Sequence, residues 1–164
     1  MIAATSLQQA RALALLVPAA LLAAAFGSEY IGGLHPCEYC WWQRWAHLVA
    51  LAFAALSFAP MPDKGRSFVW LAAIAILVSG GIGAYHAGVE AKIFEGFSTC
   101  SATGGGGETA DELLARIMNA PIVRCDEVQW SFLGISMAGW NAIVSTGFAL
   151  LIAWLSIRRP RARA

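Results

Sequence analysis

Residues 68–87 read FVWLAAIAILVSGGIGAYHA, an unbroken apolar stretch that contains no charged side chain. A helix needs ~20 mostly apolar residues to cross the hydrocarbon core of a bilayer, so this stretch predicts a transmembrane helix. Three further stretches of this kind lie at about residues 12–26, 41–58 and 134–157. The sequence therefore predicts an all-α fold, an integral membrane four-helix bundle that forms one domain over residues 1–164.

The overall composition also indicates a membrane protein. Apolar residues make up 59% of the chain and charged residues 13%, whereas soluble domains are roughly half apolar and a quarter charged. The formal net charge of +1 gives no reason to expect nucleic acid as a partner. The function is expected in or beside the bilayer.

The first predicted span has an alternative interpretation as a cleaved signal peptide. It is short, and the Ala23-Ala24-Ala25 run offers small residues to a signal peptidase. However, Arg11 is the only basic residue before the apolar run, and apolar residues resume at Tyr30 and Ile31. We therefore expect a retained helix.

The distribution of lysine and arginine predicts the orientation of the bundle, because basic loops stay in the cytoplasm. Most of the 11 basic residues fall on one side of the predicted bundle. Those residues are Arg11, Lys64, Arg66, Arg158, Arg159, Arg161 and Arg163. Both termini are therefore expected in the cytoplasm, and the loops at about 27–36 and 88–129 in a periplasm-like space.

The chain contains four cysteines, and this topology puts Cys37, Cys40, Cys100 and Cys125 together on the outer side. Disulfides form and persist outside the cytoplasm, so an even set there is interpreted first as two disulfides. Cys37 and Cys40 form a Cys-x-x-Cys motif, a spacing typical of redox-active pairs.

A zinc site is the alternative for this cysteine set, with His35 and His86 as additional ligands. Structural zinc sites usually combine two closely spaced ligand pairs, whereas Cys100 and Cys125 occur singly. We therefore expect no metal.

The surroundings of the motif favour thiolate chemistry. Pro36 precedes the motif, and the cysteines fall at the start of the second predicted span, where the positive end of the helix dipole stabilises a thiolate. Arg44 follows Cys40 by one helical turn and can lie on the same face. A snorkelling arginine that anchors headgroups is the alternative, but the neighbouring cysteines favour a functional Arg44.

Aromatic and histidine side chains flank the same position. Trp41, Trp42 and Trp45 are typical of a membrane-interface belt, and they can also form a wall for a flat hydrophobic ligand. His86 ends the third predicted span at the same depth and can donate a hydrogen bond to that ligand, although a histidine at a helix end is more often structural.

The long outer loop has two recognisable parts. Gly104 to Gly107 predict a flexible tether, and residues 109–112, Thr-Ala-Asp-Glu, form a capping-box pattern. Leu113, Leu114 and Ile117 then share one helical face, which predicts a short amphipathic helix on the membrane or on the bundle.

These motifs together resemble the disulfide bond formation protein B (DsbB) family over nearly the whole chain. The resemblance rests on the four spans, residues 36–40 (PCEYC) followed by Arg44, the loop cysteines, and residues 130–134 (WSFLG). Residues 85–90, YHAGVE, resemble the shorter-loop branch of the family. Glu38 and Tyr39, inside the motif, differ from other members.

The resemblance implies an enzyme of the bacterial inner membrane, a protein-disulfide oxidoreductase that reduces a quinone. A periplasmic DsbA-like thioredoxin-fold protein would attack Cys100 and free Cys125, which would exchange with Cys37. Cys40 would then donate electrons to ubiquinone, or to menaquinone. The quinone would be held near Arg44, with Trp41, Trp45 and His86 as further contacts.

Three other functions stay open at this point. A vitamin K epoxide reductase-like enzyme shares the cysteine types, but its loop pair precedes the Cys-x-x-Cys, whereas here it follows. A structural membrane protein whose loops are only cross-linked by disulfides would show no thiol–disulfide exchange activity. A metal-handling membrane protein would bind zinc or copper stoichiometrically.

Overall fold

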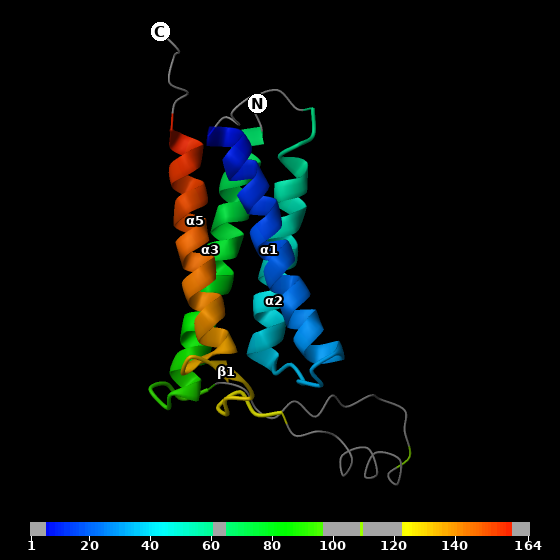
Figure 1. The fold of residues 1–164 in the computed structure, drawn as a ribbon, viewed down its shortest axis with the longest axis vertical. Coiled ribbons are helices and arrows are strands. Elements are labelled where there is room, and N and C mark those ends of the chain that lie inside the picture. The colour runs from blue at the N-terminus through cyan, green and yellow to red at the C-terminus, as the bar shows by residue number, and fades with distance from the viewer. Residues whose placement is uncertain (1–5, 61–64, 97–108, 110–122, 159–164) are drawn as a thin grey trace.

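The computed structural model describes residues 6–60, 65–96, 109 and 123–158. Its main elements are four helices: α1 (Ser6–Tyr30), α2 (Glu38–Leu56), α3 (Gly65–Glu90) and α5 (Met137–Ile157). The helices alternate in direction, so the α1–α2 loop and the segment before α5 lie at the end opposite to the α2–α3 turn (Figure 1). Two features of the predicted outer loop lie outside the described residues, namely Cys100 and the amphipathic helix expected after residue 109.

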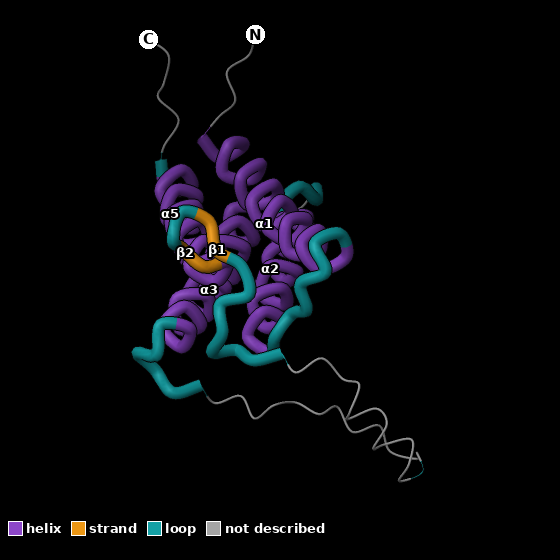
Figure 2. The backbone as a smooth tube through the Cα atoms, turned by 60° about the horizontal axis from the view of Figure 1, so that its bottom comes forward, coloured by secondary structure: helices purple, strands orange, loops and turns teal. Residues whose placement is uncertain are grey.

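The four helices form a closed ring. α3 packs against α2 and α5, and α1 packs against the same two helices on the other side. Figure 2 shows this arrangement from the end where the loops gather. The predicted all-α four-helix bundle is confirmed.

The outer surface of the bundle is apolar. Among the described residues, three helices are long and apolar enough to cross a membrane, namely Ser6–Tyr30, Gly65–Glu90 and Met137–Ile157. Large apolar side chains such as Leu48, Ile74 and Leu150 are exposed on the helices, which suits lipid and not water. α2 is less apolar because it contains Gln43, Arg44 and His47, all buried inside the bundle.

The helix ends differ from the predicted spans. The Gly27-Ser28-Glu29 segment was expected to begin a loop, but α1 continues through it to Tyr30. The backbone hydrogen bonds of a helix tolerate polar residues near its end. Beyond the end of the helix, Gly33 has a positive φ of 69°, a conformation that glycine adopts at little cost. α3 likewise continues to Glu90.

The start of the last helix differs from the prediction in kind. It was expected at Gly134, but residues 131–136 form a β-hairpin of β1 (Ser131–Phe132) and β2 (Ile135–Ser136). Leu133 and Gly134 both have positive φ, 53° and 78°, as a two-residue type I′ turn requires. The Ser136 side chain then accepts a hydrogen bond from the Gly139 N–H and begins α5.

The interior is divided along its length. Near the termini, small and branched apolar residues fill the core, among them Ala14, Ala50, Ala72, Ile76 and Ile152. Toward the hairpin end, buried polar side chains replace them. This polar half of the bundle contains the cysteine motif.

Candidate active site

Cys37 and Cys40 lie at the start of α2. The Cys37 side chain is the N-cap of the helix and accepts a hydrogen bond from the Cys40 N–H at 3.4 Å. Both residues are present as thiols, and the Cys37 Sγ donates to the Cys40 Sγ at 3.1 Å. This bond and burial raise the pKa of Cys37. Cys40 is therefore the sulfur prepared to carry negative charge.

His86 lies beside this pair. Its Nε2 is 3.6 Å from the Cys37 Sγ and 3.8 Å from a carboxylate oxygen of Glu90. On the other edge of the ring, Nδ1 is 3.2 Å from the Nε2 amide of Gln43. Because an amide N–H₂ can only donate, His86 Nδ1 accepts and Nε2 carries the proton.

The orientation of Gln43 is fixed by its other bonds. Its Nε2 also donates to the Tyr39 carbonyl at 3.1 Å, and its Oε1 accepts from the Asn141 Nδ2 at 2.7 Å. Asn141 is fixed in turn, since its Nδ2 donates to the Ser79 carbonyl at 3.1 Å. A continuous polar network therefore connects α2, α3 and α5 beneath the cysteines.

This network bears on the metal alternative. Cys37, Cys40 and His86 place three potential ligand atoms within 4.8 Å of one another. A histidine binds a metal through an unprotonated nitrogen, but the network directs the protonated Nε2 toward the sulfurs. The arrangement favours a hydrogen bond from His86 to the Cys37 sulfur over metal ligation.

Arg44 lies at the α1–α2 interface, with 5% of its surface exposed. It forms an ion pair with Glu29 and donates to the Ala25 carbonyl at 3.0 Å. Its guanidinium carbon lies 5.0 Å from the centre of the Trp41 ring, a cation–π distance. Its positive charge also acts on the Cys40 sulfur. Arg44 is thus held in place and is not a snorkelling side chain.

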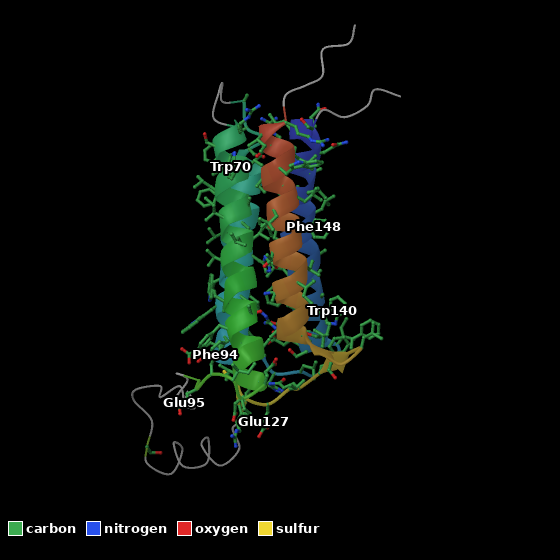
Figure 3. The ribbon with its side chains drawn as sticks, turned by 90° about the vertical axis from the view of Figure 1, so that its left-hand side faces the viewer. Trp70, Phe94, Glu95, Glu127, Trp140 and Phe148 are labelled. Carbon is green, nitrogen blue, oxygen red and sulfur yellow. The ribbon has the colours of Figure 1, made fainter. Side chains whose placement is uncertain are left out.

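A cavity of about 840 Å³ adjoins these groups, a size typical of small-molecule sites. Its lining includes Cys40, Arg44 and His86 together with apolar residues of α1 such as Leu21 and Leu22. Trp140 lies at the hairpin end of α5 (Figure 3) and its Nε1 donates to the Phe132 carbonyl at 3.1 Å. The cavity can hold a flat apolar molecule next to the Cys40 sulfur.

The tryptophans of α2 have different positions from one another. Trp41 contacts the Arg44 guanidinium, and Trp42 packs edge-on against Tyr39 with ring centres 5.4 Å apart. Trp45 has 60% of its surface exposed on the outside of the bundle. The described cavity lining includes none of the three.

Cys125 packs against the Cys-x-x-Cys motif. It is buried in a small cluster with Cys37, Tyr39 and Val89. The next residue, Asp126, accepts hydrogen bonds from Lys92 at 2.6 Å and from Arg124 at 2.8 Å. These two cations lower the pKa of the Asp126 carboxyl. The ion pairs anchor Cys125 beside Cys37.

Sequence reasoning missed several residues of this site, chiefly Glu29, Gln43, His47 and Asn141. The helical spacing could have identified two of them, because Gln43 and His47 follow Cys40 by three and seven residues and share its face. Glu29 and Asn141 come from other helices, and only the packing brings them here.

Comparisons with known proteins point to one family. The family model described as disulfide bond formation protein DsbB matches residues 8–155. Proteins named disulfide bond formation protein B are similar over most of both chains. The one from Acidovorax sp. (strain JS42) is 32% identical over 164 residues, which cover 92% of this chain and 89% of the relative.

Two further relatives have the same name. The one from Xanthomonas campestris pv. campestris (strain 8004) is 33% identical over 161 residues, 91% of each chain. The one from Marinobacter nauticus is 29% identical over 159 residues, 90% of each chain. No solved structure matches. The chain, a multi-pass membrane oxidoreductase, therefore belongs to the DsbB family, whose members reoxidise DsbA with a quinone.

Proposed function

We propose that this chain oxidises a periplasmic DsbA-like dithiol protein and passes the two electrons to ubiquinone. Two thiols lose two electrons and two protons, and the quinone gains both to become a hydroquinone. The observation that carries the proposal is the Cys40 sulfur beside Arg44 at an apolar cavity of about 840 Å³.

The electrons enter through the loop cysteines. The reduced partner attacks Cys100 of a Cys100–Cys125 disulfide and forms a mixed disulfide, which releases the Cys125 thiolate. Cys125 then attacks Cys37 of the Cys37–Cys40 disulfide, and Cys40 leaves as a thiolate. The burial of Cys125 against Cys37 supports this order.

The electrons leave through Cys40. A thiolate at Cys40 is stabilised by the Cys37 hydrogen bond and the Arg44 charge. Arg44 also stabilises the negative charge that develops on a quinone oxygen, because a fixed cation in a water-poor site needs no reorganisation. The His86 Nε2–H is a second donor at this end of the cavity. Trp41 holds Arg44, and Trp45 contacts the quinone tail or lipid.

The proposed location is the bacterial inner membrane with both termini in the cytoplasm, because segments rich in lysine and arginine stay on the cytoplasmic side. The cysteines then face the periplasm. We also propose that the chain belongs to the shorter-loop branch of the family, because residues 85–90 read YHAGVE.

The test is quinone reduction by the purified protein in detergent with a reduced thioredoxin-fold dithiol protein. Ubiquinone and menaquinone are supplied separately to identify the acceptor. Cys40→Ser should abolish quinone consumption, and Arg44→Ala should slow it while the protein stays folded. Cys100→Ser should block reaction with the partner but leave the Cys37–Cys40 disulfide intact. If no dithiol drives quinone reduction, the proposal is wrong.

A further inference from the structure

The proposed function leaves one buried imidazole of the cavity unused. His47 lines the cavity two helical turns beyond Cys40, and only 3% of its surface is exposed. Its Nε2 lies 3.0 Å from the Asn141 Oδ1. Its Nδ1 is buried and has no hydrogen-bond partner among the described residues.

The polar network determines which nitrogen of His47 carries the proton. Asn141 must direct its Nδ2 toward the Ser79 carbonyl, so its Oδ1 faces His47 and accepts. Ser145 donates its hydroxyl to the same oxygen at 2.9 Å. His47 Nε2 is therefore the N–H group, and in the neutral ring Nδ1 keeps a lone pair.

The surroundings of His47 offer no partner for a positive charge. The ring is buried, it bonds to the neutral amide of Asn141, and no described carboxylate contacts it. A buried acceptor without a donor is costly, and native proteins rarely leave one unless a water or ligand supplies the missing donor. Since His47 lines the cavity, a molecule bound there can supply the O–H or N–H donor that Nδ1 lacks.

We propose that His47 Nδ1 accepts a hydrogen bond from a hydroxyl of the hydroquinone, so that the site binds the reduced carrier more tightly than the oxidised one. This inference rests on the proposed function. An oxidised quinone offers only carbonyl lone pairs, which cannot pair with Nδ1, whereas a hydroquinone offers O–H donors. Arg44 is a donor and His47 an acceptor on one face of α2, which suits a ring with one anionic oxygen and one hydroxyl.

The preference has a consequence for the reaction. A site that stabilises hydroquinone over quinone makes the bound quinone a stronger oxidant, because binding shifts an equilibrium by its differential affinity. His47 thereby helps to draw electrons from Cys40 without touching a sulfur.

The experiment measures binding without turnover. A short-chain benzoquinone and its hydroquinone are titrated into the full-length Cys37→Ser, Cys40→Ser protein, in which neither form can react with the motif. His47→Gln keeps an amide N–H at the position of Nε2 for Asn141 but removes the acceptor at the position of Nδ1. His47→Asn is the matched control, since its side chain places an acceptor near the Nδ1 position.

The parent protein should bind the hydroquinone more tightly than the quinone. His47→Gln should weaken hydroquinone binding by about three- to tenfold, as expected for one lost hydrogen bond, with little change for the quinone. His47→Asn should retain part of the preference. An unchanged ratio in His47→Gln, or equal loss of both forms, would overturn the inference.

The two proposals fail differently. If the wild-type protein reduces quinone but the binding ratio does not depend on His47, only the inference about His47 is wrong. If the wild-type protein reduces no quinone and the parent binds neither form, both the proposed function and the inference are wrong.

Discussion

Gly83→Ala should destabilise the bundle, whereas Gly81→Ala, two residues earlier on α3, should not. A Cβ at Gly83 would lie 2.9 Å from the Ala138 carbonyl oxygen and 3.1 Å from both the Ala142 nitrogen and the Asn141 Nδ2. Two of these atoms belong to the backbone of α5 and cannot move alone. A Cβ at Gly81 would meet nothing within 4 Å. The pair therefore compares the same chemical change with and without a close helix contact.

The expected difference follows from two opposing terms. Gly→Ala in a helix gains up to about 1 kcal/mol from backbone propensity, and both variants receive this gain. Gly83→Ala additionally pushes α3 away from α5 by a few tenths of an ångström. Overpacking of this kind lowers the free energy of unfolding by about 1–3 kcal/mol. Gly83→Ala should therefore unfold roughly 2–10 °C below Gly81→Ala.

The assay is thermal unfolding of both purified variants in the same detergent, followed by circular dichroism. A melting temperature for Gly83→Ala equal to or above that of Gly81→Ala would refute the close α3–α5 packing at this position. Gly80 provides a second test, because its added Cβ would lie 2.8 Å from the Thr146 Oγ1, a side-chain atom that can rotate away. Gly80→Ala should fall between the other two.

Three further predictions concern the hairpin end of the bundle. Glu29→Gln removes the counter-charge of buried Arg44 and should lower the melting temperature in detergent more than Glu38→Gln, a change in the first turn of α2. Leu133→Asn should raise the free energy of unfolding by up to about 1 kcal/mol and so raise the melting temperature slightly, because asparagine tolerates the positive φ; a lower melting temperature would show that the exposed leucine makes a stabilising contact. Because the pKa of Cys37 is raised above the ordinary range of a cysteine thiol, the thiol stays protonated at neutral pH in the reduced protein, and iodoacetamide should label it slowly there, as peptide mass spectrometry can show; rapid labelling of Cys37 in the reduced protein at pH 7 would contradict this.

The bundle and the motif could be predicted from the sequence because both depend on local signals. Long apolar stretches determine helices, and the Cys-x-x-Cys spacing with Arg44 one turn later is visible in the chain itself. The hairpin at residues 131–136 was missed because its turn contains Leu133, a residue that rarely adopts positive φ. No turn signal other than Gly134 marked it.

The polar network could not be predicted for a different reason. Asn141 and Ser79 are ordinary polar residues inside apolar stretches, and nothing in their local sequence says which helix they face. Their meeting with Gln43 depends on how α2, α3 and α5 are rotated and aligned in the bundle. Glu29 was interpreted as part of a loop because Gly27-Ser28-Glu29 interrupts the apolar stretch, and its partner Arg44 lies on another helix.

The Glu29–Arg44 pair has a consequence for how the chain enters the membrane. Among the four described helices, α2 is the one that is not apolar enough to count as a membrane span by itself. An unpaired arginine opposes insertion by about 2.5–3.5 kcal/mol when it is central in a helix and by less near a helix end, where Arg44 lies. The counter-charge lies on the preceding helix, which leaves the ribosome first. We therefore expect α1 and α2 to enter the bilayer together, because Glu29 of α1 neutralises the arginine of α2.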